Sequence, residues 1–387
     1  MLIFVHALQL RTSTILFSQS NNKGATPPFH DTKTNMAFVE VNNIKIKGLT
    51  VCVPSNVVEN SSYTVVPETE RPSFIEAIGI ERRRVAPADV CTSDLCYKAA
   101  ENLISELGWN KDEIELLVFI SQTPDYRMPA TSCVLQHRLG LPRTCMSIDV
   151  SQGCSGYVYG LSVAGSLVST GSIKKALLLV GNTQNKNVNY NDKSTWPLFS
   201  DAGSATAIEY CQKCGDNFKL SYMTDGGGEK TIIVPDGGYR NMVSAESFVE
   251  HEYDGGIRRN NLNLFMQGDD VFAFVISNIP KATKAMYEHF NINPETIDYF
   301  LIHHASQFIL NKLKKKLNVP EEKVPIILRD YGNSSNASIP IIMAREIKED
   351  ILNRPLQLYI SGFGVGLSLG VGVITVNKMD CCNLIEY

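Results

Sequence analysis

A cysteine, a histidine and an asparagine stand at three points of the chain where the expected secondary structure changes. Cys154 lies in "IDVSQGCSGYVYGLSVAGSLV", between an apolar strand-like segment and small and apolar residues at helical spacing. A thiol at a helix N-terminus faces unpaired N–H groups and the positive end of the helix dipole, which stabilise a thiolate. The flanking Gly153 and Gly156 are expected to leave room for a ligand beside the sulfur. Cys154 is therefore a candidate nucleophile, although a single buried cysteine can also be an inert core residue.

The imidazole and the carboxamide come from the second half of the chain. His303 and His304 stand where the strand 299–302 ends, and Asn333 lies in "YGNSSNASIP", at a turn that opens another helix. Strand ends are the usual location of chemistry in α/β folds. Two neutral donors suit a carbonyl oxygen that gains negative charge, but a core histidine and a helix-capping asparagine would serve structure alone. The order Cys, His, Asn also fits a papain-like hydrolase, whose cysteine has a different local signature near the mature N-terminus.

The elements that would position these residues alternate between helices and buried strands. Residues 91–109 form an expected amphipathic helix, and residues 113–123 form an all-apolar strand of the kind covered on both faces. In the second half, an expected helix at 270–290 precedes a strand at 295–306, and 356–377 is a Gly-punctuated strand pair. This pattern predicts α/β layers in two structurally duplicated halves.

The domain boundaries follow from the same pattern. We expect one half at residues 36–210, an irregular Gly- and Asn-rich excursion at 211–264, and the other half at 265–387. Residues 1–35 differ in composition and are expected to be an unstructured or non-native extension, because Met36 opens a clear alternating strand.

Composition limits the class of protein. The chain has 387 residues, 20% of them charged, and a net charge of −4. It has no dominant basic face for nucleic acid and no apolar run of the roughly 20 residues that a membrane span needs. The ten cysteines are scattered and predict reduced thiols in a cytoplasmic protein. "CQKC" at 211–214 has the spacing of half a zinc site or of a redox pair, and is interpreted as coincidence.

Five motifs together resemble one known family. They are "DVSQGCSGYVYGLSVA", "PLFSDAGSATAI", "IDYFLIHHAS", "YGNSSNASIP" and "SGFGVGLSLG". In this order, across roughly residues 37–377, they resemble the serial motifs of β-ketoacyl-ACP synthase III, a condensing enzyme of the thiolase superfamily. The resemblance implies a thiolase-like fold with a five-layered α-β-α-β-α core. Asn333 follows His303 by 30 residues, the family's spacing, which selects His303 over His304 as the catalytic histidine.

The resemblance also implies a mechanism without metal or organic cofactor. Cys154 would take an acyl group from a thioester, and malonyl-ACP would then bind with its thioester carbonyl against His303 and Asn333. Loss of CO₂ would give an enolate that attacks the acyl group. The backbone N–H groups of Cys154 and Val365 would form the oxyanion hole.

Some family positions differ in this chain. The positions that clamp the adenine of CoA fall on Ser73 and Lys193, and a nearby arginine position falls on Ala77. The acyl donor is therefore either an acyl-CoA or an acyl-ACP. Met128 falls where the family places a residue that closes the partner's acyl pocket across a homodimer.

The acidic acyl carrier protein would need a basic docking surface. The lysines after the His303 strand are candidates, although such a run is often only a solvated helix face, and arginines 82–84 are a weaker alternative. The lysines are Lys312, Lys314, Lys315 and Lys316.

Other activities of the same fold stay open to different degrees. A non-condensing acyltransferase, which passes the acyl group to an alcohol or amine, is the main alternative. A thiolase is disfavoured because it needs a second cysteine before the last glycine turn, whereas Cys381 and Cys382 lie beyond it. A hydroxymethylglutaryl-CoA synthase would need a catalytic glutamate, for which only Glu76 lies near the right region. An inactive partner subunit would usually lose the nucleophile, which is retained here.

Overall fold

A computed structural model describes residues 36–387 of the protein, so the expected extension at 1–35 lies outside the described residues. Within this part of the chain, no helix combines the length and apolar character that crossing a membrane requires.

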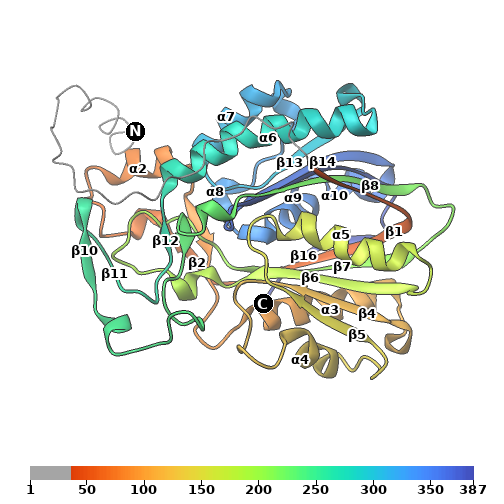
Figure 1. The fold of residues 1–387 in the computed structure, drawn as a ribbon, viewed down its shortest axis with the longest axis horizontal. Helices are drawn as coiled ribbons and strands as arrows, with labels where there is room; N and C mark the ends of the chain where they lie inside the picture. Colours follow the sequence, from red (N-terminus) through yellow and green to blue (C-terminus); the bar gives the residue numbers. More distant parts are fainter. Residues whose placement is uncertain (1–35) are drawn as a thin grey trace, which may run out of the picture.

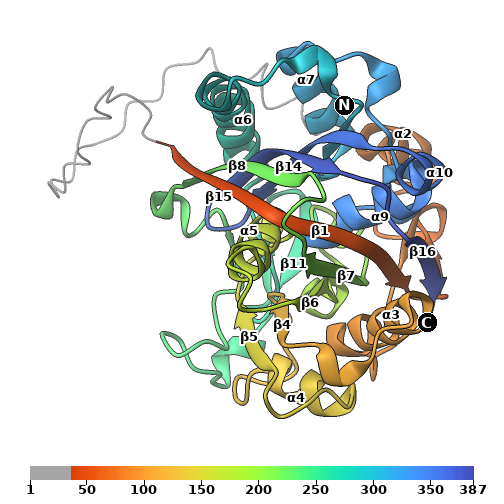
Figure 2. The same ribbon diagram turned by 90° about the vertical axis from the view of Figure 1, so that its right-hand side faces the viewer.

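One sheet of ten strands runs through the molecule, in the order β13-β14-β15-β8-β1-β7-β6-β4-β5, with β16 paired to β1. The long β1 joins the two halves, because its first residues pair with β8 and its later residues with β7 and β16. Figure 2 shows β1 crossing the whole molecule with β16 beside its far end. The strands are β1 (Ala37–Val53), β4 (Leu116–Ile120), β5 (Met146–Val150), β6 (Lys175–Asn182), β7 (Ala202–Tyr210), β8 (Asp216–Thr224), β13 (Tyr299–Ile302), β14 (Leu356–Gly364), β15 (Ser368–Val376) and β16 (Cys381–Glu386).

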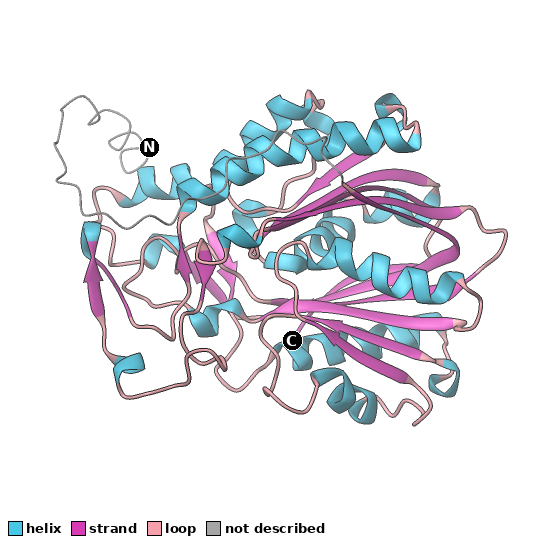
Figure 3. Ribbon diagram, in the orientation of Figure 1, coloured by secondary structure: helices cyan, strands magenta, loops and turns pink. Residues whose placement is uncertain are grey.

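The helices lie on both outer faces and between the two halves of the sheet (Figures 1 and 3). Helices α6 and α7 cover one outer face, α3 and α4 cover the other, and α5 and α9 fill the middle. Three buried apolar clusters match these interfaces, the largest being the one around α5 and α9. The predicted five-layered α/β architecture is confirmed. The helices are α2 (Arg71–Ile78), α3 (Thr92–Leu107), α4 (Thr131–Arg138), α5 (Gly156–Ser169), α6 (Gly268–Phe290), α7 (Gln307–Leu317), α8 (Leu328–Tyr331), α9 (Ser338–Glu346) and α10 (Lys348–Asn353).

The range 211–264 differs from the irregular segment that the sequence predicts. It begins with a disulfide between Cys211 and Cys214, so the interpretation of all cysteines as reduced thiols, and of this pair as coincidence, is wrong. It continues with β8, which lies inside the sheet between β15 and β1. A second departure is β16, which follows the C-terminal half in sequence but extends the sheet of the N-terminal half.

The excursion proper, which in the structure runs from the end of β8 to the start of α6, holds four short strands in two separate pairs. A buried ion pair fixes it to the loop between β6 and β7, because Arg259 Nη1 lies 3.2 Å from Asp192 Oδ2. The same guanidinium stacks on Tyr253 and Phe265, at 4.0 and 4.5 Å from their ring centroids. Another pair, β2 (Val57–Glu59) with β3 (Arg82–Arg84), lies near α2. The four strands are β9 (Ile232–Ile233), β10 (His251–Tyr253), β11 (Ile257–Arg259) and β12 (Phe265–Met266).

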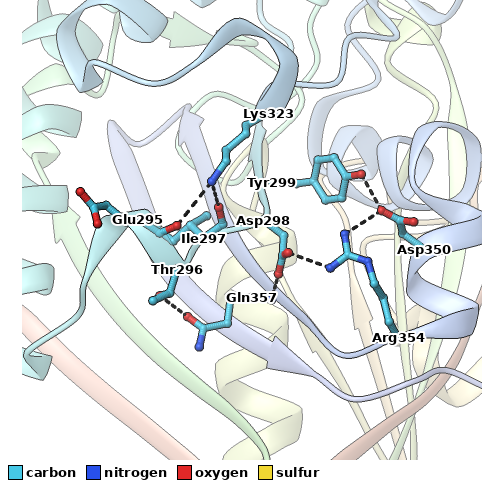
Figure 4. A network of polar contacts seen from close by, with 9 residues as sticks. All are labelled: Glu295, Thr296, Ile297, Asp298, Tyr299, Lys323, Asp350, Arg354 and Gln357. Atoms are coloured by element: carbon cyan, nitrogen blue, oxygen red, sulfur yellow. Dashed lines mark hydrogen bonds and ion pairs between the residues drawn. The ribbon is translucent and has the colours of Figure 1, made fainter.

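A polar network holds the start of β13, the strand that leads to His303 (Figure 4). Asp298 accepts hydrogen bonds from Arg354 Nη1 at 2.8 Å and from the backbone N–H of Gln357 at 2.7 Å. Lys323 Nζ donates to the Ile297 carbonyl at 2.6 Å. These contacts fix the register in which β13 pairs with β14. Because side chains alternate between the two faces of a strand, the register also determines which residues face the middle layer at the end of β13.

Candidate active site

Cys154 lies at the turn between β5 and α5, two residues before the first helical residue, as the sequence predicts. The neighbouring Ser155 hydroxyl binds the Ser368 hydroxyl at 2.8 Å, which ties the turn to the start of β15. Gly364, at the end of β14, approaches so closely that a Cβ there would lie 3.0 Å from the sulfur. Only a glycine at this position leaves the sulfur uncrowded, and its φ of +156° lies in a region that other residues rarely adopt.

The two glycines beside Cys154 serve packing and not ligand space, contrary to the sequence-based expectation. A Cβ on Gly153 would lie 2.3 Å from a methyl of Val365 and 2.6 Å from the amide oxygen of Gln122. A Cβ on Gly156 would lie 2.9 Å from Ile120. The space beside both glycines is filled by protein atoms.

The Asn333 carboxamide is oriented by backbone contacts. Its backbone N–H donates to the Leu198 carbonyl at 2.8 Å, and its own carbonyl accepts from Ser200 at 2.9 Å. The side-chain Oδ1 accepts from the backbone N–H of Ser335 at 3.0 Å. Since a backbone N–H can only donate, this bond identifies the oxygen and leaves Nδ2 as the donor for a further partner.

His303 follows β13 and is buried between the two halves. Its backbone N–H donates to the Ser361 carbonyl at 2.8 Å, and its ring packs edge-on against Phe363 with centroids 5.2 Å apart. Nδ1 lies 2.9 Å from the Ser338 hydroxyl, at the start of α9. Burial lowers the pKa of His303 to about 3, with a smaller contribution from His304, so the ring is neutral at physiological pH.

Ser335, in the short 3-10 helix η9 (Ser335–Ala337), connects the three predicted residues. Its hydroxyl lies 3.6 Å from Cys154 Sγ, and its N–H binds Asn333. Its carbonyl accepts from the Ser338 hydroxyl at 2.7 Å, the same hydroxyl that contacts His303. The structure therefore brings the thiol, the carboxamide and the imidazole into one hydrogen-bonded cluster, hereafter the Ser335 cluster. His304 is fully buried, and neither ring nitrogen has a partner among residues 36–387.

The resting state of Cys154 differs from the predicted thiolate. Burial raises the pKa of the thiol, whereas the Ser335 hydroxyl and the backbone N–H groups of Cys154 and Val365 lower it by a smaller amount. The helix N-terminus was visible in the sequence pattern, but the depth of burial was not. The two N–H groups named for the oxyanion hole therefore both favour the anionic form of the Cys154 sulfur.

The remaining predicted residues lie outside the Ser335 cluster. Met128 is 76% exposed on the loop before α4. Lys193 is half-buried next to the excursion. Its Nζ would lie 3.7 Å from a Cβ atom added to Gly255. Three lysines lie exposed along α7, whereas Lys314 is paired with Glu321. The exposed ones are Lys312, Lys315 and Lys316.

The two buried histidines predict acid sensitivity. In the unfolded chain each imidazole titrates near 6.5, but burial lowers the pKa of both His303 and His304 to about 3. Between these values the unfolded state binds more protons, so the free energy of unfolding falls as the pH falls, by up to about 1.4 kcal/mol per pH unit for each ring. Urea unfolding should therefore show that a His304→Gln variant loses about 1–2 kcal/mol less than the wild type between pH 7 and pH 5. Equal losses in the two proteins would contradict this assignment.

Comparison with known proteins places the chain in a family. Residues 148–226 match the family described as 3-oxoacyl-[acyl-carrier-protein (ACP)] synthase III, and residues 287–376 match its C-terminal part. The chain is 30% identical over 334 residues to the β-ketoacyl-[acyl-carrier-protein] synthase III of Lactococcus lactis, covering 86% of this chain and 99% of that protein. It is 31% identical over 329 residues to the enzyme of the same name from Clostridioides difficile, covering 85% and 97%.

A solved structure agrees with this. The crystal structure of a 3-oxoacyl-(acyl-carrier protein) synthase from Burkholderia xenovorans superposes with a TM-score of 0.85 at 36% identity, covering 91% of this chain and 99% of that one. The fold, the motif order and these likenesses lead to one conclusion. The chain belongs to the β-ketoacyl-ACP synthase III family of thiolase-like condensing enzymes.

Proposed function

We propose that this acyltransferase joins an acyl thioester to malonyl-ACP by decarboxylative Claisen condensation, with the acyl group held on Cys154. The observation that carries the proposal is the Ser335 cluster, in which a thiol, a neutral imidazole and an oriented carboxamide share hydrogen-bond partners. The thiol acts in both half-reactions, and the imidazole and the carboxamide act in the second.

In the first half-reaction the Cys154 sulfur attacks the carbonyl carbon of the acyl donor. A new S–C bond forms, the bond to the donor's sulfur breaks, and the thiol proton ends on the released carrier thiol. The backbone N–H groups of Cys154 and Val365, which lower the pKa of the Cys154 thiol, stabilise the oxyanion of the tetrahedral intermediate.

In the second half-reaction malonyl-ACP loses CO₂ and becomes an enolate. Its oxygen accepts hydrogen bonds from Asn333 Nδ2 and from Nε2–H of His303. For Nε2 to carry the ring proton, the Ser338 hydroxyl turns from the Ser335 carbonyl and donates to His303 Nδ1 instead. The enolate carbon attacks the acyl carbonyl, the Cys154 sulfur leaves, and a proton from solvent restores the thiol. A histidine with a low pKa suits this role because it donates without becoming charged.

The acyl carrier protein and a second copy of the chain complete the proposed assembly. Lys312, Lys315 and Lys316 offer an exposed cationic surface on α7, the helix that follows His303. The strand β5 is an open edge of the sheet, and the exposed Met128 lies in the loop between β4 and α4. Pairing of β5 edges would form a homodimer in which Met128 reaches the partner's acyl pocket.

Intact-mass measurement tests the proposed intermediate. The wild-type protein, offered a panel of acyl-CoAs and acyl-ACPs, should gain the mass of one acyl group, and a Cys154→Ala variant should gain none. The panel also reports which carrier delivers the acyl group. Acylation of the variant to the wild-type extent would refute Cys154 as the nucleophile. Acylation of the wild type without any decarboxylation of malonyl-ACP would instead favour the non-condensing acyltransferase.

A further inference from the structure

Ser335 has a contact with the sulfur that the mechanism above does not use. We infer that the Ser335 hydroxyl is a catalytic hydrogen-bond donor to Cys154 Sγ, and that Asn182 directs its proton there. The inference rests on the proposed role of Cys154 as nucleophile. It adds Ser335 and Asn182 to the residues that favour the reactive thiolate.

The orientation of the Asn182 carboxamide is the first step. Asn182 ends β6, is 1% exposed, and its Oδ1 accepts from the backbone N–H of Gln122 at 2.9 Å. The Ser121 hydroxyl donates to the same oxygen at 3.2 Å. Because a backbone N–H has no acceptor capacity, these contacts identify the oxygen and assign Nδ2 to the other side.

The direction of the Ser335 proton follows. Asn182 Nδ2 lies 3.1 Å from Ser335 Oγ and can only donate, so the hydroxyl oxygen is the acceptor of that bond. The hydroxyl proton is then free to point elsewhere, and Cys154 Sγ lies 3.6 Å away, within the range of a hydrogen bond to sulfur. The chain of donors runs from the end of β6 through Ser335 to the nucleophile.

The backbone geometry separates this role from a purely structural one. Ser335 has φ = +53°, in the left-handed region that glycine adopts at least cost. Its N–H and carbonyl already make the contacts with Asn333 and Ser338. A glycine would keep both backbone contacts with less strain, so the hydroxyl is the part of this residue that the turn does not need.

The donor would act at both points where the sulfur is negative. When the thiol loses its proton to attack the donor, and again when the thiolate leaves during condensation, a hydrogen bond to charged sulfur is stronger than one to the neutral thiol. Burial alone disfavours the thiolate. The stronger hydrogen bond to the charged sulfur opposes this effect and shifts the ionisation of Cys154 toward the thiolate, the reactive form.

The pH dependence of alkylation tests the inference without any acyl donor. Iodoacetamide modification of Cys154 in the full-length protein, followed by peptide mass spectrometry between pH 6 and 10, reports its ionisation. We expect Ser335→Ala to move the midpoint upward by about one pH unit, so that alkylation near pH 7.5 slows about tenfold. Asn182→Asp keeps the acceptor for Gln122 but removes the donor, and should move the midpoint in the same direction. The exposed Cys133 in the same samples should be unaffected.

Matched variants make the outcome decisive. Ser338→Ala removes a neighbouring hydroxyl that contacts His303 and the Ser335 carbonyl but not the sulfur. It should leave the Cys154 midpoint at its wild-type value while slowing malonyl-ACP decarboxylation. Ser335→Gly, which relieves the strain, serves if the alanine variant does not fold. An unchanged midpoint in a folded Ser335 variant overturns the inference even if Cys154 remains the acylated residue. Failure of the wild type to form an acyl-enzyme overturns the proposed function instead.

Discussion

Replacing Asn333 by alanine should slow decarboxylation of malonyl-ACP by about 100-fold or more while acylation of Cys154 continues. The carboxamide oxygen is held by the Ser335 N–H, so Nδ2 is already aimed before substrate binds. A preorganised donor to a developing oxyanion typically contributes about 2.7–4 kcal/mol of barrier lowering, because it needs no reorganisation during the reaction. Removing it should therefore affect the enolate-forming step and not the step in which Cys154 is acylated.

Release of CO₂ from malonyl-ACP, compared with acyl-enzyme formation by intact mass, separates the two half-reactions. Asn333→Asp is the matched variant, since it keeps the acceptor for Ser335 but presents negative charge to the enolate, and its loss should be at least as large. If the alanine variant decarboxylates within threefold of the wild type, Asn333 is a structural residue of the turn. A parallel loss of acylation would mean that the substitution disturbs the whole Ser335 cluster.

Replacing Asp192 by alanine should lower the free energy of unfolding by about 3–5 kcal/mol. The Asp192 side chain is fully buried and that of Arg259 is 8% exposed, with 3.2 Å between their charged atoms. Removing one partner leaves a buried guanidinium without its counter-charge, which costs far more than a surface ion pair contributes. The loss should appear in urea unfolding at constant pH.

A second substitution identifies the cause. In the double variant Asp192→Leu with Arg259→Met no charge is left uncompensated, so most of the stability should return. The exposed pair Lys284–Glu288, with side chains 79% and 68% exposed, provides a surface control, because Glu288→Ala should cost less than about 1 kcal/mol. If Asp192→Ala costs no more than Glu288→Ala, the ion pair does not hold the excursion in place.

The layered fold could be predicted because its strands and helices differ sharply in pattern. The apolar strand within 113–123 and the amphipathic helix within 91–109 are present as β4 and α3. The strand β8 has the alternating polar and apolar residues of a strand in "DNFKLSYMT", but it was missed because it adjoins a glycine-rich stretch and was assigned with it to the irregular segment. Its partners, β15 and β1, come from distant parts of the chain, and local pattern carries no information about such pairing.

The candidate site was predictable in part for the same reason. Cys154, His303 and Asn333 were found from residue type, position at element ends and family resemblance. Ser335 and Asn182 were not, because their contact joins residues 153 positions apart in the sequence. The run of serines after Asn333 was a visible signal, but only the packing of η9 against the end of β6 shows which hydroxyl reaches the sulfur.

The pairing of β16 with β1 has a consequence for synthesis of the protein. The two strands pair from Gly48 opposite Cys381 to Val53 opposite Glu386. This edge of β1 therefore stays unpaired until the ribosome has translated β16, in the last part of the described chain. A growing polypeptide would therefore carry an open edge next to the half that holds the nucleophile, and such edges favour association with other nascent chains. Chaperone binding during translation would be most useful in this interval, before the final strand arrives.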